Sequence, residues 1–496
     1  MAQDGTIRVP LNRVEGDLEI RTRIDDGVVS EAWSSGTMFR GFERILAGRG
    51  ALDGLVITPR ICGVCTTGHL TAAARALDQI AGVRLPPDAV RVRNVALMTE
   101  HIQSDMRHAF LMFTPDLVRP DHARLPLYEE ARRRYPPLQG ATVVETIRHT
   151  KRVLEIVALL GGQWPHSSFM VPGGVVSVPG DSDLQQCRLL LRQYRQWYED
   201  RVLGCPLERW LAVDSGAALD AWLDESPAHR DGELGFYVRF ARQAGLETLG
   251  RGPGSFLSYG SLDLPESTAV RSPDGGPQLV PAGLARGVEV RPFDQALIAE
   301  HVAFSWFRDT EGALHPSQGQ TEPYATGDES RKYSWAKAPR YDGLPAETGP
   351  LAEMVVSRKP LFVDLVGRCG ASAFSRELAR LVRPAELLPA MATWLDELRE
   401  GGEFYTAPGR LTDGAGFGLT HASRGALGHW VELKDGAIAH YQVITPTAWN
   451  ASPRDGDEVR GPIEEALVGT PAADGDAASL GHVVRSFDPC LVCTVH

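Results

Sequence analysis

The sequence predicts an α+β fold that is mainly helical, with a central helical bundle and peripheral β-hairpins. Three observations indicate this: long segments with apolar residues at helical spacing, two Asp-Gly turns between alternating segments, and the absence of an internal repeat or long linker. Length alone would suggest about three domains. Because nothing marks a domain boundary, we instead expect residues 1–496 to form a single domain.

Two hairpins are predicted, one near each end of the chain. In the first, residues 17–24 and 28–34 flank the turn Asp26-Gly27. In the second, residues 430–433 and 438–444 flank the turn Asp435-Gly436. Both show the period-two character of half-buried strands.

Helices are predicted between the hairpins, over residues 87–113, 141–160 and 184–203. The pattern continues over residues 375–399, where we expect Pro384 and Pro389 to break it into shorter pieces. The Gly- and Pro-rich stretch 249–294 predicts loops with short strands, and residues 474–479 predict a small-residue loop before the last element.

The composition excludes several classes of protein. With 43% hydrophobic and 23% charged residues, the chain is neither disordered nor fibrous. A net charge of −12 argues against electrostatic binding of nucleic acid. The sequence contains no apolar run of about 18 residues, so no transmembrane helix is predicted. The start of the chain lacks the apolar region of a secretory signal, so we expect a cytoplasmic location, with export on a partner's signal as the alternative.

Four of the seven cysteines form two CxxC pairs, Cys62 with Cys65 and Cys490 with Cys493. Such spacing directs two sulfurs to one point, and thiolates select soft or borderline metals. Two converging pairs would give a buried site with four sulfur ligands. A structural zinc site fits this spacing equally well, whereas a thioredoxin-like redox pair fits less well because no βαβ pattern flanks either motif.

The remaining cysteines and the chain end complete this prediction. Cys187, Cys205 and Cys369 are expected to be buried core thiols. The sequence stops three residues after Cys493, at His496. Since a terminus normally frays, ligands placed there suggest that the chain end is tucked inside, as after a maturation step.

The two CxxC motifs resemble those of a known family, the nickel–iron hydrogenase large subunit. The segments RICGVCTTGH and DPCLVCTVH are similar to its RxCGxCxxxH and DPCxxCxxH motifs. Four further segments resemble family elements in the correct order: residues 12–16 (RxEG), 39–43 (RGxE), 423–430 (PRGALxHW) and 446–450 (PTTWN, with Ala448 in place of a hydroxyl residue). The likeness covers the full length and implies a hydrogenase, an H2:acceptor oxidoreductase.

The resemblance implies a nickel–iron centre whose iron carries carbon monoxide and cyanide. Cys62 and Cys490 would be terminal nickel ligands, and Cys65 and Cys493 would bridge the two metals. Pro446 and Thr447 would line the cyanide ligands. This centre agrees with the metal site predicted from the CxxC spacing alone, because thiolates are suitable ligands for a redox-active metal.

Other residues would hold or move protons and charges around this centre. The resemblance implies that Glu15 is a proton-relay carboxylate and that Arg424 is a positioned guanidinium oriented by the carboxylate of Asp488. Asp116 would be a second acidic group, and His69 would lie near a bridging sulfur. Glu43 and His496 would be magnesium ligands. Arg424 could act as a base only if unusually buried, since arginine normally stays protonated. A structural salt bridge is the alternative for Arg424, and a strand-end cap is the alternative for Glu15.

The chain departs from the family pattern in ways that leave its role open. Asp17 stands where histidine is common, which resembles the cytoplasmic uptake and hydrogen-sensing branch. Ser423 replaces a proline, and no extension follows His496. Val64 favours an enzyme over the sensors, which tend to have isoleucine there. The leading hypothesis is H2 oxidation; the alternatives are a hydrogen sensor that signals to a partner protein, and a zinc-stabilised structural or interaction protein.

Electrons released from H2 must leave the subunit. The sequence has no further cysteine cluster that could hold iron–sulfur centres. We therefore expect an obligatory iron–sulfur small subunit across a large apolar interface, giving a heterodimer, together with maturation proteins that load the metals.

Overall fold

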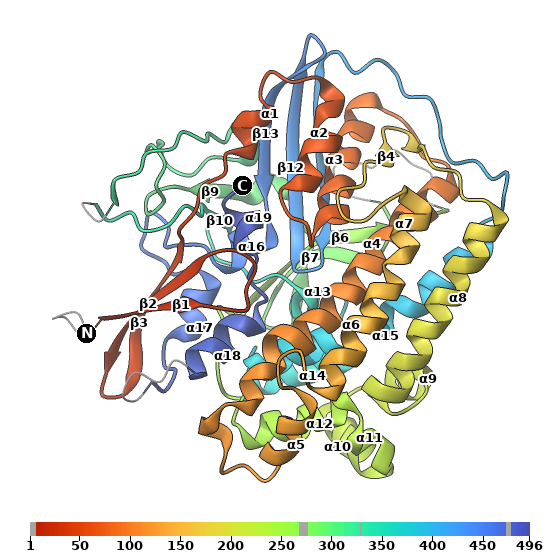
Figure 1. Cartoon of the computed structure of the whole chain (residues 1–496). Coiled ribbons are helices and arrows are strands. Elements are labelled where there is room, and N and C mark those ends of the chain that lie inside the picture. Colours follow the sequence, from red (N-terminus) through yellow and green to blue (C-terminus); the bar gives the residue numbers. More distant parts are fainter. Residues whose placement is uncertain (1–5, 267–275, 328–329, 473–477) are drawn as a thin grey trace.

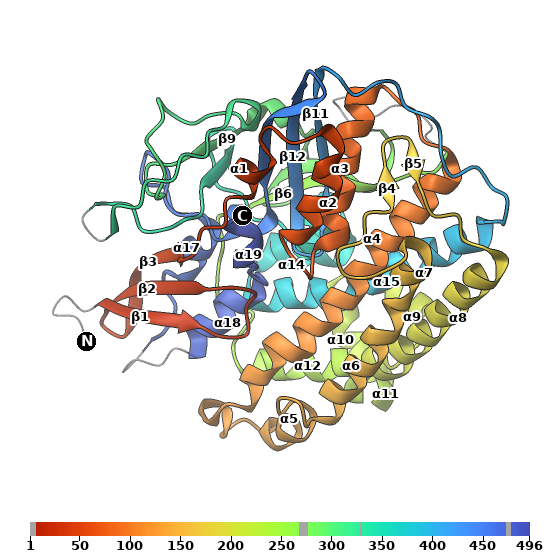
Figure 2. The same ribbon diagram turned by 45° about the horizontal axis from the view of Figure 1, so that its top comes forward.

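A computed structural model describes residues 6–266, 276–327, 330–472 and 478–496. Long helices stand side by side in one part of the molecule, and antiparallel sheets occupy the other (Figures 1 and 2). The fold is thus a mixture of helix and sheet, so that "mainly helical" describes it only in part. The first four residues of the predicted loop 474–479 lie outside the described part.

The strands of the described residues pair in small antiparallel sheets. Three sheets have three strands each, in the orders β1-β2-β3, β6-β7-β8 and β11-β12-β13, and the pairs β4-β5 and β9-β10 complete the set. Their bounds are β1 Thr6–Leu11, β2 Leu18–Asp25, β3 Val28–Gly36, β4 Met170–Val171, β5 Gly174–Val175, β6 Ser255–Asp263, β7 Gln278–Arg286, β8 Glu289–Arg291, β9 Ile298–His301, β10 Ala338–Tyr341, β11 Gly414–Ala422, β12 Gly425–Lys434 and β13 Ala437–Ile444.

Both predicted hairpin turns are confirmed. Asp26 and Gly27 have φ of 52° and 76°, and Asp435 and Gly436 have φ of 52° and 79°. Two successive residues with positive φ twist the chain in the direction that antiparallel strands require, and the Asp-Gly dipeptide tolerates this conformation. The turns therefore fix the registers of β2 with β3 and of β12 with β13.

Two predictions about the sheets were wrong. The late hairpin is not peripheral: it belongs to a three-stranded sheet whose strand β12 is buried over most of its length. Among the described residues of the stretch 249–294, only β8, with three residues, is as short as predicted, whereas β6 and β7 have nine residues each. Strand β6 is buried on both faces, so its sequence lacks the alternation that identifies a half-exposed strand.

The helices account for most of the remaining described chain. Their bounds are α1 Phe42–Leu46, α2 Gly54–Ile57, α3 Thr66–Ala81, α4 Pro87–Arg107, α5 Tyr128–Arg134, α6 Ala141–Val153, α7 Glu155–Gly161, α8 Asp181–Trp197, α9 Leu207–Leu211, α10 Gly216–Glu225, α11 Pro227–Asp231, α12 Glu233–Gln243, α13 Pro350–Val356, α14 Pro360–Cys369, α15 Ala373–Glu397, α16 Pro446–Asn450, α17 Pro462–Leu467, α18 Ala478–Ser486 and α19 Leu491–Thr494. Wider π-helical turns extend α4 over His108–Phe113 and α8 over Tyr198–Leu203.

The predicted helices 87–113 and 184–203 are present, but the predicted helix 141–160 is divided into α6 and α7. Helix α15 differs from the prediction in the opposite direction. It runs without interruption from Ala373 to Glu397 and contains both Pro384 and Pro389. Each proline removes one backbone hydrogen bond. Residues 373–385 are all buried, and we attribute the continuity of the helix to this packing, which outweighs the local preference.

Packing of the N-terminal sheet against the C-terminal helices brings the two ends of the chain together. Leu18 and Ile20 of β2 share a hydrophobic core with Ile463 of α17 and with Val483 and Val484 of α18. Figures 1 and 2 both place the C-terminus beside α19 and near α1. The last residues therefore end inside the molecule, where His496 is only 9% exposed.

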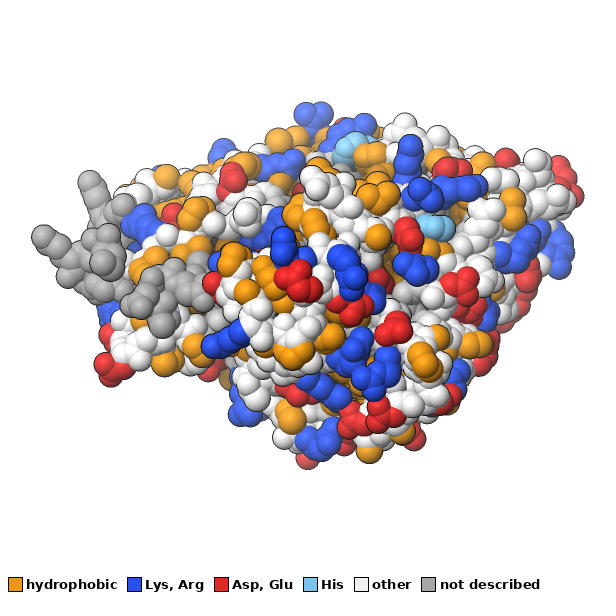
Figure 3. Space-filling view, turned by 60° about the horizontal axis from the view of Figure 1, so that its bottom comes forward, with side chains coloured by type: hydrophobic (Ala, Val, Ile, Leu, Met, Phe, Trp, Pro, Cys, Tyr) orange, Lys and Arg blue, Asp and Glu red, His pale blue; other side chains and the backbone are white. Residues whose placement is uncertain are grey.

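The lower face of the molecule carries mixed charge. Figure 3 shows Lys and Arg side chains interspersed with Asp and Glu on this face, near which α5, α10 and α12 lie in Figure 1. Ion pairs connect these helices internally; for example, Arg242 Nη1 of α12 lies 2.6 Å from Asp220 Oδ1 of α10. No helix among the described residues is long and apolar enough to cross a membrane.

Candidate metal centre

The two CxxC pairs come together although 428 residues separate Cys62 from Cys490. Cys62 and Cys65 lie on the turn that enters α3, and Cys490 and Cys493 lie at the start and within the last helix, α19. The four sulfurs are buried and lie within 4.8 Å of one another. The Sγ atoms are 3.5 Å apart between Cys62 and Cys490, and 3.1 Å apart between Cys490 and Cys493.

All seven cysteines are free thiols. Cys187 and Cys205 are buried as predicted, but Cys369 is exposed, because it is the last residue of α14 and faces the surface. The prediction of a buried thiol was wrong at this one position.

The four clustered thiols share protons. Hydrogen bonds from the neighbouring thiols, first from Cys490, lower the pKa of Cys62 well below its ordinary value. Burial instead raises the pKa of Cys490 and of Cys493. Four negative sulfurs this close cannot coexist in a buried site without a cation, so deprotonation of the whole group would accompany metal binding.

Backbone pairing places the second CxxC pair against the N-terminal segment. Glu15 forms a parallel bridge with Cys490, and its carbonyl accepts the N–H of Leu491 at 2.6 Å. Arg40 donates to the carbonyl of Val492 at 3.0 Å and also to the carbonyl of Ile61. One guanidinium therefore joins the two CxxC segments; Arg40 belongs to the RGxE element at residues 39–43, but the resemblance assigns no role to this arginine.

Arg424 connects the two cysteine pairs through side chains. Its Nη1 lies 3.2 Å from Cys65 Sγ, and its Nε donates at 3.0 Å to both the carbonyl and Oδ1 of Asp488. Burial lowers the pKa of Arg424, but the charges of Asp488 and Cys65 outweigh burial and hold it well above its ordinary value. Arg424 is thus a fixed positive charge that touches a ligand sulfur, as the predicted orientation by Asp488 requires.

His69 lies in the first turn of α3, directly after the first pair. Its Nδ1 contacts His429 Nε2 at 3.1 Å, and its Nε2 has no hydrogen-bond partner among the described residues. Burial lowers the pKa of His69 to about 3, so the ring is neutral. Because a buried polar atom normally has a hydrogen-bond partner, we expect Nε2 of His69 to interact with a group that is present only when the metal centre is assembled.

Glu100 of α4 is a buried carboxyl group that sequence reasoning missed. It accepts the N–H groups of Thr67 at 2.8 Å and Gly68 at 3.1 Å, which are free because they begin helix α3. Burial, together with the nearby charge of Cys65, raises the pKa of Glu100 to about 8. A single glutamate inside a helix carries no motif that could have identified it.

Glu43 and His496 meet as predicted, with Oε1 and Nε2 3.1 Å apart. Glu43 also accepts the N–H of Val443 at 2.9 Å and lies 3.5 Å from Lys337 Nζ. Burial alone would raise the pKa of Glu43, but the charge of Lys337 and the hydrogen bond with His496 outweigh burial. The pKa of Glu43 therefore lies below its ordinary value. Glu300, another residue that the sequence did not suggest, lies near this group, and burial raises its pKa to about 7.

The remaining predicted residues occupy different surroundings. Thr447 Oγ1 accepts the N–H of Cys490 at 2.9 Å, and Pro446 precedes it at the start of α16. The carboxylate of Asp116 instead pairs with Arg485 Nη1 at 2.5 Å and with Arg13. Asp116 thus binds one arginine from each end of the chain, and no contact with a cysteine is found among the described residues.

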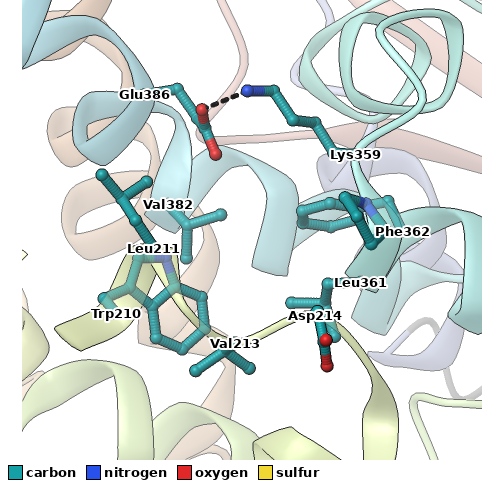
Figure 4. Close-up of a pocket in the computed structure, with 10 residues that line it drawn as sticks. Trp210, Leu211, Val213, Asp214, Lys359, Leu361, Phe362, Val382 and Glu386 are labelled. Carbon is teal, nitrogen blue, oxygen red and sulfur yellow. Dashed lines mark hydrogen bonds and ion pairs between the residues drawn. The ribbon is translucent and has the colours of Figure 1, made fainter. Parts of the chain in front are cut away.

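A cavity of about 340 Å³ lies elsewhere, between α9, α14 and α15 (Figure 4). Apolar side chains such as Trp210, Leu361 and Val382 line it, and Lys359 faces Glu386 across one side with Nζ and Oε2 2.5 Å apart. None of the residues predicted from the motifs lines this cavity.

Comparison with known proteins agrees with the geometry. The family described as nickel-dependent hydrogenase matches residues 40–123 and 240–496. The periplasmic [NiFeSe] hydrogenase large subunit of Desulfomicrobium baculatum is 33% identical, over 100% of this chain and 96% of that protein. The hydrogenase-2 large chain of Escherichia coli K12 is 29% identical, over 98% and 96%.

Solved structures agree as well. The reduced, active Ni-Fe-Se hydrogenase of Desulfomicrobium baculatum has a TM-score of 0.85 at 30% identity and covers 99% of this chain and 100% of its own. The reduced Ni-Fe-Se hydrogenase of D. vulgaris Hildenborough gives a TM-score of 0.83 at 31% identity, covering 99% of both chains.

Proposed function

Because this chain belongs to the nickel-dependent hydrogenase family, we propose that it is the catalytic large subunit of an enzyme that cleaves H2 heterolytically into protons and electrons. One observation supports this most strongly. Four buried cysteine sulfurs, drawn from opposite ends of the chain, lie within 4.8 Å of one another beside a buried arginine. Soft sulfur ligands in this number suit redox-active transition metals.

The donor set fits the nickel–iron centre that the motifs suggest. Cys62 and Cys490 would hold nickel as terminal ligands, Cys65 and Cys493 would bridge nickel to iron, and the iron would carry carbon monoxide and cyanide. When bound, this centre supplies the redox chemistry that accepts the two electrons of H2. Thr447, whose hydroxyl oxygen already accepts the N–H of Cys490, can donate its own proton to one of the iron's ligands, and Pro446 would line the same pocket.

The chain's own residues fix the charge and the protons around the metals. Arg424 stays protonated and acts as a positioned charge next to Cys65, with Asp488 holding its orientation. A role for Arg424 as a base is therefore disfavoured. Glu15 is the proposed proton relay, since its main chain pairs with the residues on both sides of Cys490 and its side chain is half-buried. We assign Asp116 a structural part, between Arg13 and Arg485.

A magnesium ion held by Glu43 and His496 is a further proposal. The carboxylate is a hard oxygen ligand, and Glu300 lies near enough to influence it. Lys337 Nζ, 3.5 Å from Glu43 Oε2, is the competing cation in this pocket. His69 would lie near the bridging sulfur of Cys65, while its Nδ1 contacts Nε2 of His429.

Electron transfer requires a partner, and we propose the iron–sulfur small subunit, joined to this chain in a heterodimer after maturation proteins have loaded the metals. Exposed apolar side chains gather on the segment that leads to the first CxxC pair: Met38, Ile45, Leu52 and Val56 are 39–52% exposed. Arg40 of the same segment contacts Val492, between the last two cysteines. A partner that covered this surface would lie directly beside the metal centre.

The cellular location follows from the partner. The relative from D. baculatum is named a periplasmic enzyme. Export of this chain on a small subunit that carries the signal would give the same location, while a small subunit without a signal would leave the enzyme in the cytoplasm.

The direct test is H2-dependent reduction of an artificial electron acceptor by the purified, metal-replete enzyme. Sustained turnover supports H2 oxidation. Near-zero turnover in a sample that contains nickel and iron would contradict it and support a hydrogen sensor. A sample that contains zinc alone would support a structural protein, and infrared bands of carbon monoxide and cyanide would exclude that reading.

A further inference from the structure

The end of the chain, residues 490–496, forms a segment that cannot hold its own position. Its helix α19 has only four residues, and helices shorter than about 12 residues are marginal in water without outside contacts. Two of the four clustered cysteines, Cys490 and Cys493, belong to this segment. The distance between the two cysteine pairs therefore depends on the contacts that hold the chain end in place.

Arg40 supplies two such contacts at the end of α19. The last carbonyl groups of a helix find no donor within the helix, so other groups must provide one. The Nη1 atom of Arg40 donates to the carbonyl of Val492 at 3.0 Å, and the backbone N–H of Arg40 donates to the carbonyl of Val495 at 2.9 Å. One residue thus holds the chain end through both its side chain and its main chain.

The same guanidinium reaches the first cysteine pair. Besides Val492, the Nη1 atom of Arg40 donates to the carbonyl of Ile61. Ile61 directly precedes Cys62. In the same way, Val492 directly precedes Cys493. A single nitrogen atom therefore links the main chain beside one cysteine of the first pair to the main chain beside one cysteine of the second pair.

Two further contacts fix the direction of this guanidinium. Its Cζ lies over the ring of Phe42, 4.6 Å from the ring centre, and its Nη2 donates to the carbonyl of Arg60 at 3.2 Å. A cation over an aromatic face is attracted to it, and a planar guanidinium loses little freedom for each hydrogen bond that it forms. Nη1 is thereby held between the two CxxC segments.

Arg40 and Arg424 connect the cysteine pairs in different ways. Arg424 uses two nitrogens, Nη1 for the sulfur of Cys65 and Nε for Asp488. Arg40 uses one nitrogen for both segments, and the groups that it binds there are main-chain carbonyls. We therefore expect Arg40 to act on the positions of the cysteines and not on the chemistry of a sulfur atom.

We propose that Arg40 is a positioning residue for the metal centre, which clamps the chain end against the turn of the first CxxC pair. The clamp keeps the four sulfurs within the 4.8 Å that separates them in the structure. Without it α19 would move away from that turn, and two of the four ligands would leave the metal together. The retention of the metal rests on the proposed function, whereas the holding of the chain end does not.

Hydrogen exchange measured by mass spectrometry on the purified enzyme tests whether Arg40 holds the chain end. In R40Q the side-chain amide carries no charge and is too short to reach the place of Nη1. Residues 487–496 should take up deuterium roughly 10- to 100-fold faster in R40Q than in the wild type, because hydrogen bonds to a charged group are lost. The buried strand β6 should exchange at the same rate in both proteins.

Metal release tests the consequence for the centre. The enzyme is incubated with excess EDTA, and the metal that stays on the protein is measured over time. Nickel should leave R40Q roughly 10- to 100-fold faster than the wild type, the usual effect of removing an interaction that orients metal ligands. Zinc at this site would contradict the proposed function, but its rate of loss would test the clamp in the same way.

R188Q is the matched control for both measurements. Arg188 also binds main-chain carbonyls, those of Leu395 at 2.7 Å and Leu398 at 3.0 Å, but it joins α8 to the end of α15. R188Q should therefore keep the wild-type rates of exchange at the chain end and of metal release.

Two more variants separate the clamp from a general loss of stability. One nitrogen of Arg40 serves both segments, so the ammonium of lysine can take its place, and R40K should recover most of both rates. R40M keeps an apolar stem beside Phe42 but has no donor, so it should behave like R40Q. Wild-type rates in both R40Q and R40M, equal changes in R40K and R40Q, or faster exchange of the chain end without faster metal release would overturn the proposal.

Discussion

Arg424 connects the two ends of the chain, since it contacts Cys65 from one end and Asp488 from the other. We predict that R424K lowers the rate of H2 oxidation about 100-fold or more. Lysine supplies one charged point and cannot reach the sulfur and the carboxylate together. H2-dependent dye reduction measures the effect.

The control for that experiment is R91K. Arg91 is another charged member of ion pairs, but it binds Asp88, Glu266 and Glu397 near the start of α4. This variant should keep wild-type turnover. If R424K were as active as R91K at equal metal content, the guanidinium would have no part in the reaction.

Glu464 allows a test of the buried electrostatics that is independent of the metals. Burial raises its pKa from 4.5 to about 7, and its Oε1 accepts hydrogen bonds from Ser34 N–H at 2.9 Å and Tyr333 O–H at 2.7 Å. Below pH 4.5 the group is protonated in both the folded and the unfolded chain. Between pH 4.5 and 7 it ionises only in the unfolded chain, so stability falls as pH rises, by on the order of 3 kcal/mol in total.

E464Q removes this titration while keeping an acceptor oxygen. Relative to the wild type, its urea midpoint should therefore be higher at pH 8 than at pH 5. Glu100 and Glu300 titrate in the same range in both proteins, so the difference between the two isolates Glu464. A stability difference that stays constant with pH would show that Glu464 is ionised in the fold.

Individual residues differed in how far the sequence could identify them. The four cysteines, Arg424 and Asp488 stand in motifs, and the structure brings them together. Glu100 stands alone in α4, and the packing of α4 against α3 gives it its neighbours. The resemblance implies that Asp116 is an acidic group around the metals, whereas its ion-pair partners in the structure are Arg13 and Arg485.

At the scale of elements, the contact of α3 with the sheet β11-β12-β13 positions the first cysteine pair. Gly418 of β11 faces the helix so closely that a Cβ atom would lie 1.8 Å from the carbonyl oxygen of Ala72. We predict that G418A destabilises the protein by about 3 kcal/mol, because the helix must move away from the sheet. Thermal or urea unfolding measures this loss.

Gly367 provides the control with the opposite expectation. It lies inside α14, where a Cβ atom would meet only Val288 at an ordinary distance of 3.9 Å. G367A should leave stability unchanged or raise it by about 1 kcal/mol, the usual gain of alanine over glycine in a helix. Similar destabilisation by both changes would mean that α3 and β11 are not in this tight contact.

The sequence predicts the elements that depend on local patterns, but it does not predict those that depend on packing. The two Asp-Gly hairpins are local features and are confirmed. Strand β11, with its run of glycines, was not predicted, because glycine is chosen there for the approach of α3 and disfavours strands in general. The continuity of α15 through two prolines likewise depends on burial, which no local pattern shows.

At the scale of the whole molecule, we expect the exposed apolar residues within 38–56 to contact a partner subunit. Scattered exposed apolar residues are ordinary, but a group of them beside a metal centre indicates an interface. We predict that the active enzyme elutes in size-exclusion chromatography as a complex with an iron–sulfur subunit. Charged replacements such as I45E with L52E should dissociate it and abolish transfer of electrons to the natural acceptor.

A matched pair of changes elsewhere tests whether that surface is specific. Val176 and Leu138 are more exposed than Ile45 and Leu52 and lie on other segments, so V176E with L138E should leave the complex intact. An isolated large subunit that is monodisperse and fully active would contradict the need for a partner. The single domain expected from the sequence also remains a prediction, since it concerns how the chain unfolds.

We propose that both ends of the chain together hold one nickel–iron centre, on the clustered side chains of Cys62, Cys65, Cys490 and Cys493. Elemental analysis of the purified enzyme and of its C490S variant tests this most directly. We predict one nickel and one iron per large subunit in the wild type, after subtraction of the iron of the small subunit, and loss of nickel in C490S. Zinc in place of nickel, or nickel retained in full by C490S, would contradict the account.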